Sequence, residues 1–205
     1  MSPTYWSRAS DELAAADAVM AGLVRRYAGP GLVSRGDAFA TLARSIVGQQ
    51  ISVKAADAVW GRFAAAIGRV APDAVLAQGA AGLAGCGLSR RKIEYVLDLA
   101  GHFAAGRLQP QHWSTLDDQA VIAELTDVRG IGRWTAEMFL IFNLLRPDVF
   151  PLDDLGLQKA VCQHYFAGVP QNRAALATFG ERWRPWRTVA TWYLWRSLDP
   201  VPVEY

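Results

Sequence analysis

The sequence predicts an all-α protein. Apolar residues recur at three- and four-residue steps along most of the chain, and alternating runs of β-branched residues are absent. Glycine and proline interrupt this periodicity at intervals typical of helix ends, as at Gly29-Pro-Gly31 and Gly85-Cys-Gly87. We therefore expect helices over residues 10–27, 38–50, 52–67, 72–77, 90–105, 117–125, 133–145, 154–166, 171–182 and 186–197.

Three of the expected helices have a residue at their start that can accept a hydrogen bond from the first turn. These N-cap residues are Asp37, Ser52 and Ser89. No repeat or low-complexity segment is visible, and no linker is long enough to separate independent domains. With 205 residues the chain can bury a substantial core.

The composition is that of a globular protein, with 52% hydrophobic and 20% charged residues. The net charge of +2 does not by itself indicate a nucleic-acid binder. Basic residues do cluster locally, at 90–92 and over 182–196, where four tryptophans alternate with four arginines. This mixture suits phosphates and stacked bases, although for each arginine taken alone a surface charge or an ion-pair partner is favoured over a DNA contact. With eight tryptophans in the chain, we expect most to lie in the core.

Cysteine and histidine usage argues against a metal centre built from side chains. The two cysteines are far apart and form no Cys-x-x-Cys pair, and the three histidines lack ligand spacing. No apolar run approaches the length of a membrane span, and the first residues lack the pattern of a signal peptide. We expect a cytoplasmic protein in a reducing compartment, with no membrane partner.

The most informative segment is Thr126-Asp-Val-Arg-Gly-Ile-Gly-Arg-Trp-Thr-Ala-Glu137. Gly130 and Gly132 lie between two expected helices, so the backbone can turn tightly and present amide groups at the start of the second helix. The positive end of a helix dipole favours an anion there, and Arg133 and the hydroxyl of Thr135 could add to the site. The simpler alternative is a plain helix–helix turn that uses glycine for steric reasons.

A pair of carboxylates, Asp153 and Asp154, follows the next apolar helix in the segment that begins at Pro151. If the hairpin holds a nucleic-acid backbone, an acidic side chain from this pair could reach a neighbouring sugar. The alternative is that both aspartates cap the helix that follows.

These motifs, in this order, resemble the helix-hairpin-helix DNA glycosylase superfamily, and within it the alkylation-repair branch of 3-methyladenine DNA glycosylase II. The resemblance extends from about Gly29 to Trp195. It is carried by Asp37-Ala-Phe39, Ile46-Val-Gly-Gln-Gln-Ile-Ser52, Val128-Arg-Gly-Ile-Gly-Arg-Trp-Thr-Ala136, Asp148-Val-Phe150 with Asp153-Asp154, and Glu181-Arg-Trp-Arg-Pro-Trp-Arg187.

The resemblance implies that Asp154 is the catalytic carboxylate and leaves Asp153 as the N-cap of the next helix. Breaking an N-glycosidic bond builds positive charge on the deoxyribose, and a fixed carboxylate would stabilise that charge or orient the attacking water. Strand-cleaving relatives have a lysine, which forms a Schiff base, where this chain has Trp134. The resemblance therefore implies a monofunctional hydrolase that leaves an abasic site.

The resemblance also implies a base pocket with Trp134 and Trp195 as aromatic walls, which would attract the positive charge of an alkylated purine. Met138 stands where some relatives have a tyrosine, so it offers a thioether and no hydroxyl. For both tryptophans the alternative is core packing. Gln50 falls at the wedge position that fills the gap left by the flipped nucleotide, although an exposed glutamine at a helix end is an equal alternative.

By resemblance, the fold is a two-lobed helical bundle with a DNA-binding cleft between the lobes. One lobe comprises 1–37 with 147–205, and the central lobe, 38–146, carries the wedge loop and the hairpin at about 126–136. Some relatives carry an additional N-terminal β domain, which we do not expect here. No cofactor is required, but a structural Na⁺ or K⁺ on the backbone carbonyls of Thr126, Val128 and Gly130 is implied.

The function expected from the resemblance is hydrolytic excision of alkylated purines, of the 3-methyladenine and 7-methylguanine type, from duplex DNA in base excision repair. The partner would be double-stranded DNA with damaged bases, and we expect a monomer. Two alternatives stay open at this point: a DNA-damage-binding protein without turnover, and a glycosylase for deaminated or oxidised bases.

Overall fold

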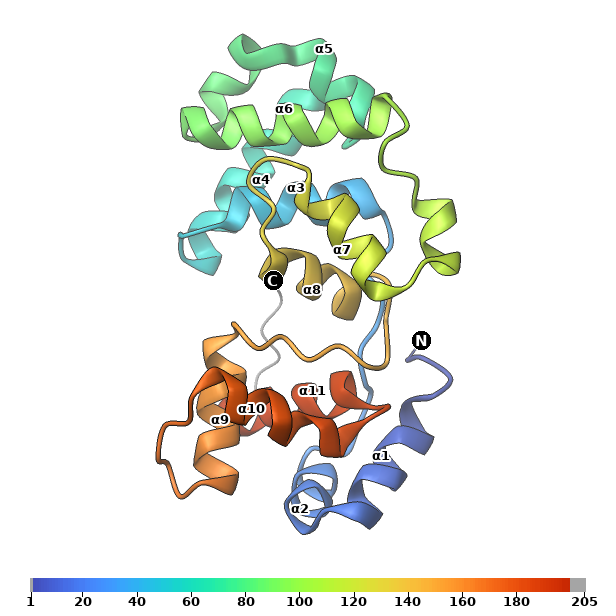
Figure 1. Cartoon of the computed structure of the whole chain (residues 1–205). Helices are drawn as coiled ribbons and strands as arrows, with labels where there is room; N and C mark the ends of the chain where they lie inside the picture. The colour runs from blue at the N-terminus through green and yellow to red at the C-terminus, as the bar shows by residue number, and fades with distance from the viewer. Residues whose placement is uncertain (1, 200–205) are drawn as a thin grey trace. The chain divides into compact units, whose positions relative to one another are not determined.

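The computed structural model describes residues 2–199. Within this range the structure is all-α, as predicted, and contains no strand (Figure 1). The α-helices are α1 (Trp6–Ala16), α2 (Ala18–Arg26), α3 (Ala38–Gly48), α4 (Val53–Ile67), α5 (Pro72–Leu83), α6 (Arg90–Ala104), α7 (Asp118–Thr126), α8 (Arg133–Phe142), α9 (Leu155–Tyr165), α10 (Arg173–Gly180) and α11 (Arg187–Leu198). Short 3₁₀ helices cover Ala84–Cys86, Pro110–Thr115 and Glu181–Trp183.

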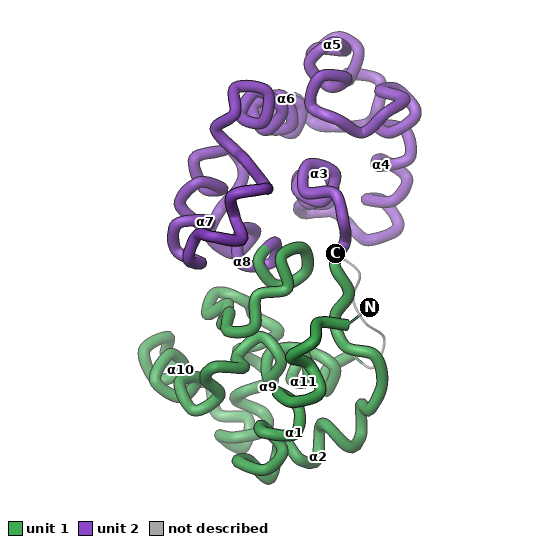
Figure 2. The backbone as a smooth tube through the Cα atoms, turned by 90° about the vertical axis from the view of Figure 1, so that its right-hand side faces the viewer, with its two compact units in different colours: residues 1–34, 140–204 green, residues 35–139, 205 purple. Residues whose placement is uncertain are grey.

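The chain forms two compact units (Figure 2). Unit 1 contains the described residues up to Ser34 together with those from Leu140 onward, and unit 2 contains Arg35–Phe139. The sequence had placed the boundaries at 37/38 and 146/147. In the structure both boundaries fall earlier, at 34/35 and at 139/140, and the second lies inside α8.

In unit 1, α11 packs against α1, α2 and α9. Seven consecutive residues of α11, from Thr188 to Leu194, are buried, so this helix is covered on every side. Trp183, which comes just before it, is also fully buried. Unit 1 therefore has α11 at its centre and the other helices around it.

In unit 2, α6 lies between α5 and α3, and α4 contacts both α3 and α5 (Figure 1). The buried residues of α3 are spaced for one face, with Phe39, Leu42, Ala43, Ile46 and Val47 in the core. This packing fixes the C-terminal end of α3, which leads directly into the loop at Gln49 and Gln50.

The three N-caps predicted from the sequence are confirmed. The side chains of Asp37, Ser52 and Ser89 accept hydrogen bonds from the backbone amides of Ala40, Ala55 and Lys92. Each satisfies an amide that the helix itself leaves without a partner.

Several helix boundaries were predicted wrongly. The helix expected over 10–27 is two helices, because Asp17 is extended and its side chain accepts from Val19 and Met20 to start α2. The helix expected over 133–145 ends at Phe142, and the amide of Arg146 bonds back to Leu140 (2.9 Å) around Leu145 at φ 54°. Elsewhere the helix expected to reach 50 ends at Gly48, and that expected over 171–182 is shortened to α10. The predicted 72–77 corresponds to the first part of α5, because Gly79 has a non-helical backbone (φ 59°) that kinks this helix.

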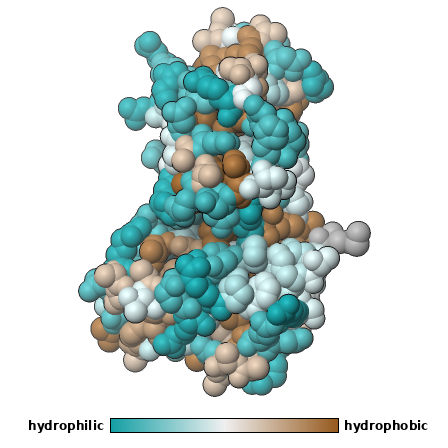
Figure 3. Space-filling view, turned by 45° about the vertical axis from the view of Figure 1, so that its right-hand side comes forward, coloured by the Kyte–Doolittle hydropathy of each residue, from teal (hydrophilic) through white to brown (hydrophobic). Residues whose placement is uncertain are grey.

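Half of the tryptophans lie in the core and half are partly exposed. Trp6, Trp113, Trp183 and Trp192 are buried, whereas the other four are half-buried. One face of the molecule is mainly hydrophilic with separate hydrophobic patches (Figure 3). Among the described helices, none has the length and apolar character needed to cross a membrane.

Candidate active site and DNA-binding hairpin

The hairpin joins α7 to α8 and turns at Gly130, whose φ of +87° suits glycine. A Cβ at this position would collide with the ring of Tyr95, so glycine also permits close packing against α6. The amide of Ile131 bonds the carbonyl of Val128 (3.1 Å), and the carbonyl of Gly132 accepts the first helical bond of α8 from Ala136 (3.0 Å). The turn is therefore tight, and α8 starts immediately after Gly132.

The start of α8 has no local cap, because glycine has no side chain that could accept from the first turn. Within the described chain, the amides of Gly130 and Gly132 form no hydrogen bond. Arg133 is partly engaged, since it contacts Glu137 (2.9 Å) and Gln119 (3.2 Å). These amides and the helix dipole give the hairpin the properties of an anion site.

The side chain of Thr135, whose hydroxyl was suggested from the sequence as a phosphate contact, is buried. A contact between this hydroxyl and a phosphate stays a prediction. Because Thr135 is the third residue of α8, its amide is the group that points toward the helix start.

Trp134 and Met138 are four residues apart and therefore lie on one face of α8. Trp134 is half-buried, whereas Met138 is buried. Both belong to unit 2, as does the hairpin. The indole is accessible enough to contact a ligand, and the thioether lies beneath the surface.

Asp154 is the N-cap of α9 and is only 6% exposed. Its Oδ1 accepts two hydrogen bonds, from the amide of Leu157 (2.7 Å) and from the indole Nε1 of Trp195 (2.8 Å). The expectation that Asp153 would cap this helix is wrong. Asp153 is exposed and pairs with Arg173 (3.0 Å), so the capping function and the buried position both fall to Asp154.

Trp195 is held on two sides. One face of its ring stacks on Phe142, with centroids 5.8 Å apart and planes inclined by 10°. Gly156 lies next to both Asp154 and Trp195. A Cβ at this position would be 3.2 Å from Asp154 Oδ1 and 3.5 Å from Trp195 Cδ1. Phe142 and Gly156 were not predicted from the sequence, because only the fold brings them beside Trp195.

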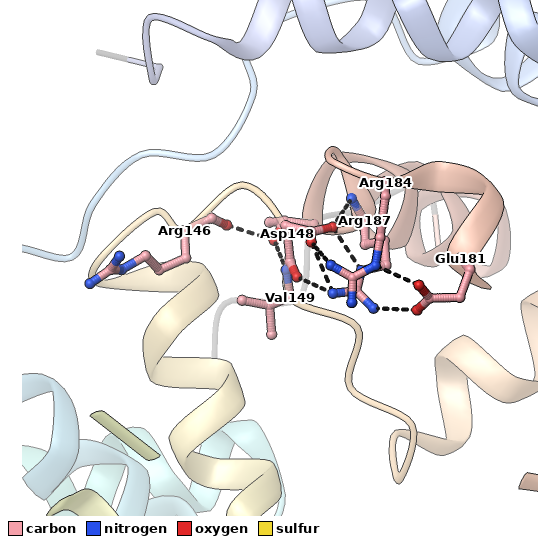
Figure 4. A network of polar contacts seen from close by, with 7 residues as sticks. Arg146, Asp148, Val149, Glu181, Arg184 and Arg187 are labelled. Atoms are coloured by element: carbon pink, nitrogen blue, oxygen red, sulfur yellow. Dashed lines mark hydrogen bonds and ion pairs between the residues drawn. The ribbon is translucent and has the colours of Figure 1, made fainter. Parts of the chain in front are cut away.

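The segment that leads to Asp154 is anchored by the start of α11 (Figure 4). Arg187 donates from Nε to Asp148 Oδ1 (2.7 Å) and from Nη2 to Asp148 Oδ2 (2.9 Å) and to its carbonyl (3.0 Å). The hydroxyl of Thr188 donates to the carbonyl of Arg146 (2.6 Å) and accepts from the amide of Val149 (2.9 Å). Side chain and backbone of this segment are therefore both fixed.

Glu181 completes this cluster from the other side (Figure 4). It pairs with Arg184 (2.6 Å) and Arg187 (2.9 Å), and Arg184 also reaches Asp148 (2.7 Å). Hydrogen bonds from Arg184 and the charges of both arginines hold the pKa of the Glu181 carboxyl below its usual value. The cluster has two carboxylates and two guanidinium groups, so its charges balance.

The arginines of the basic and aromatic segment 182–196 make contacts within unit 1. Arg182 lies over the ring of Phe179 (3.6 Å), and Arg196 lies over Tyr27 and Trp192. The simpler interpretation, that these arginines are partners in intramolecular contacts, is the one the structure supports.

Gln50 lies in the loop after α3, and its side chain is exposed. Its φ is +60°, which is uncommon for a residue with a Cβ. The neighbouring Gln49 donates from Nε2 to the carbonyl of Gly130 (2.8 Å). The predicted wedge position and the hairpin are therefore joined within unit 2.

The three carbonyls expected to hold an alkali ion can be tested for fit. The carbonyl of Val128 accepts from Ile131 and that of Gly130 accepts from Gln49. Each oxygen has a second lone pair, so these bonds leave both carbonyls able to coordinate a cation, and the alkali-ion site stays a prediction. Among residues 2–199, no group of three or more His, Cys, Asp or Glu could bind a metal.

The structure thus brings together the predicted site residues in two sets. Asp154 and Trp195 are in direct contact in unit 1. The hairpin, Gln50, and the Trp134–Met138 face belong to unit 2.

Comparison with known proteins assigns the family. Residues 43–185 match the HhH-GPD superfamily of base excision DNA repair proteins, and the chain belongs to this superfamily. A putative DNA-3-methyladenine glycosylase, YfjP of Bacillus subtilis, is 28% identical over 88% of this chain and 66% of its own length. DNA-3-methyladenine glycosylase 1 of Schizosaccharomyces pombe is 32% identical over 85% of this chain and 78% of its own length.

Solved structures agree with this assignment. A DNA-3-methyladenine glycosidase from Bacillus halodurans superposes with a TM-score of 0.84 at 35% identity, covering 91% of this chain and 87% of the other. The S. pombe 3-methyladenine DNA glycosylase, solved in complex with abasic DNA, gives a TM-score of 0.79 at 29% identity, covering 96% and 100%. The predicted fold and the predicted family are therefore confirmed.

Proposed function

We propose that this protein is a DNA glycosylase that hydrolyses the N-glycosidic bond of alkylated purines in duplex DNA and leaves an abasic site. The observation that carries the proposal is the buried Asp154 carboxylate, whose Oδ1 is fixed by the amide of Leu157 and the indole of Trp195. The relatives named as 3-methyladenine glycosylases support the same chemistry.

The carboxylate acts on the charge that develops during the reaction. As the bond between sugar and base lengthens, the deoxyribose gains oxocarbenium character, and a preoriented carboxylate stabilises it better than mobile water does. The same group orients the water that attacks C1′. A purine alkylated at N3 or N7 is cationic and leaves readily, so the site needs little general-acid assistance.

The base is recognised by aromatic surface. Trp134 and Trp195 attract a cationic purine more strongly than a neutral one, through their ring quadrupoles. Phe142 stacks on one face of Trp195 and the Nε1 edge bonds Asp154, so both contacts fix the orientation of the ring that a base would meet. Met138, one turn from Trp134, is buried, so its polarisable thioether would back the pocket from below, and it offers no hydroxyl.

The DNA backbone is held by the hairpin. The amides of Gly130 and Gly132, the first turn of α8 and Arg133 bind a phosphate, and Gln50 fills the space left by the flipped nucleotide. The carbonyls of Thr126, Val128 and Gly130 would hold a Na⁺ or K⁺ ion, which supplies positive charge for the same phosphate. The relative solved on abasic DNA supports DNA as the partner. We propose that the protein acts as a monomer.

The strand stays intact, because the position of the Schiff-base lysine in strand-cleaving relatives is taken by Trp134. Borohydride added during the reaction should therefore trap no covalent adduct between protein and DNA. A trapped adduct would contradict a purely hydrolytic mechanism.

The decisive experiment compares wild type with Asp154→Asn on duplexes that contain 7-methylguanine or 3-methyladenine. Asparagine caps helices as well as aspartate does, so α9 should be preserved. We expect base release by wild type and a loss of at least ~100-fold in the variant, the scale of removing a transition-state charge partner. Asp153→Asn, at an exposed neighbour, is the matched control and should retain full activity.

The alternatives give different results in the same assay. A binding protein without turnover would bind lesion DNA but release no base at any protein excess. A glycosylase for deaminated or oxidised bases would prefer hypoxanthine or 8-oxoguanine in a panel of single-lesion duplexes. Equal release by wild type and Asp154→Asn would refute the proposed mechanism.

A further inference from the structure

The loop after α3 holds a glutamine in an unfavourable backbone conformation. Gln50 has φ +60°, where the Cβ of a non-glycine residue crowds the backbone. Its side chain is exposed and forms no hydrogen bond to any other described residue. Strained residues persist only where the surrounding structure holds them, so the contacts around Gln50 must supply that restraint.

Lys92 supplies part of the restraint on the backbone at Gln50. This residue lies in the first turn of α6, and its Nζ donates to the carbonyls of Val47 (2.8 Å) and Gln49 (2.6 Å). These carbonyls belong to the end of α3 and to the residue just before Gln50, where a helix has unsatisfied acceptors and the negative end of its dipole. Lys92 is half-buried, and this burial lowers the pKa of its ammonium group.

Gln49 extends the restraint to the hairpin. Its backbone carbonyl accepts from Lys92, and its side-chain amide donates to the carbonyl of Gly130 (2.8 Å). One residue thus links α6 to the loop and the loop to the hairpin.

The same face of α6 also contacts the hairpin directly. Tyr95, three residues after Lys92, packs against Gly130 so closely that only glycine fits. Asp98, three residues further on, accepts from the amide of Arg129 (2.9 Å) and pairs with its guanidinium (3.2 Å). Helix α6 therefore fixes the loop after α3 and the hairpin relative to each other.

We propose that Lys92 is a positioning residue, which holds the Gln50 wedge in its strained conformation and in register with the phosphate-binding hairpin. This inference rests on the proposed function, since it concerns how the wedge acts on duplex DNA. Without the ammonium group, the chain at Gln50 can relax to ordinary backbone angles, and the wedge loses its fixed direction. Loss of this restraint should raise the free energy needed to flip a base out of a paired duplex, and leave the barrier to breaking the glycosidic bond unchanged.

The test separates these two steps. Single-turnover excision of 7-methylguanine is measured in a duplex opposite cytosine and in a one-nucleotide bulge, where the lesion has no partner base. We expect Lys92→Met to slow excision about tenfold or more from the paired duplex and less than about threefold from the bulge, because a bulged base costs little to flip. Lys92→Arg, which keeps the charge and the donors, should restore part of the rate.

Two further variants guard against a general loss of folding. Gln49→Ala breaks the link to Gly130 while leaving the Lys92 contacts with the backbone, and it should show the same preference for the bulge with a smaller loss. Lys159→Met removes an exposed lysine on α9 and should behave as wild type on both substrates. An equal loss for Lys92→Met on both substrates, or no loss on either, would overturn the proposal.

A binding readout keeps this inference distinct from the proposed chemistry. The fluorescence of 2-aminopurine placed at the target position rises when that base leaves the stack, and it requires no excision. Lys92→Met should reduce this rise relative to wild type in the paired duplex. If wild type flips the base but releases none of the lesions, the proposed glycosylase activity fails while the fluorescence comparison still decides the function of Lys92.

Discussion

The indole of Trp195 donates to Oδ1 of Asp154 over 2.8 Å, and the amide of Leu157 donates to the same oxygen over 2.7 Å. Asp154 is thus a helix cap and a buried carboxylate at once. The cap bond fixes the rotamer of the side chain relative to α9, and the indole fixes it relative to α11. Two helices therefore position one oxygen atom, which is the preorganisation that electrostatic catalysis requires.

Trp195→Phe should lower the excision rate without unfolding the protein. Phenylalanine keeps the stacking on Phe142 but removes the N–H donor to Asp154. A hydrogen bond to a charged group contributes about 1.5–3 kcal/mol, so kcat should fall by roughly tenfold to a hundredfold if that energy is lost in the transition state. Trp186→Phe is the control, since it removes the same donor from the exposed Glu12. An unchanged kcat in Trp195→Phe would show that the indole does not position the carboxylate.

Gly156→Ala tests the space around the same contact. The added Cβ would lie 3.2 Å from Asp154 Oδ1, which is tighter than an ordinary contact, so the carboxylate or the indole must shift by a few tenths of an ångström. We expect kcat to fall several-fold, since small displacements at a reacting centre are costly. Gly22→Ala, in α2, has nothing within 4 Å of the new Cβ and should stabilise the protein by about 0.5–1 kcal/mol with kcat unchanged. Steady-state kinetics and thermal melts of both variants provide the comparison.

The sequence predicted the parts of the fold that depend on local rules. Asp37, Ser52 and Ser89 cap their helices as expected, because an N-cap needs only a suitable side chain at a helix start. Asp17 shows the limit of such rules. It interrupts an apolar pattern that is continuous in sequence, and its capping of α2 becomes visible only with the backbone in place.

The site was less predictable because its contacts are long-range. Asp148 and Arg187 are 39 residues apart, and nothing in either segment alone selects the other as its partner. The arginines of 182–196 therefore looked available for DNA, although the structure gives them carboxylates and aromatic rings of unit 1. Asp153 and Asp154 could not be distinguished as caps by composition, since both are aspartates at a helix start.

Arg187→Lys should destabilise unit 1. The side chains of Arg187 and Asp148 are 14% and 22% exposed, and lysine cannot reproduce the forked contacts with the carboxylate, the carbonyl and Glu181. We expect the free energy of unfolding in urea to fall by about 1–3 kcal/mol, as for hydrogen bonds to charged groups left incomplete. Arg69→Lys, at an exposed pair with Asp73, should change it by less than about 0.5 kcal/mol. Equal stabilities of the two variants would mean that the Arg187 cluster contributes no more than a surface pair.

His164 should make stability depend on pH near neutrality. Burial lowers the pKa of its imidazole, and Nε2 lies 2.8 Å from the hydroxyl of Ser197. That hydroxyl donates its one proton to the carbonyl of Leu194 (2.6 Å), so Nε2 must be the donor to Ser197. Between the lowered folded pKa and the unfolded value of about 6.5, the unfolded chain binds a proton that the folded chain does not. The contribution of His164 to stability is therefore complete above about pH 6.5 and declines as the pH falls below it.

The measurement is urea unfolding of wild type and His164→Gln at a series of pH values between about 5.5 and 7.5, the range in which an ordinary imidazole titrates. Wild type should lose more stability than the variant on going from the upper to the lower pH, since glutamine does not titrate. His112→Gln, which removes an exposed imidazole, should follow the wild-type profile. Parallel profiles for wild type and His164→Gln would show that the half-buried imidazole does not couple protonation to folding in this range.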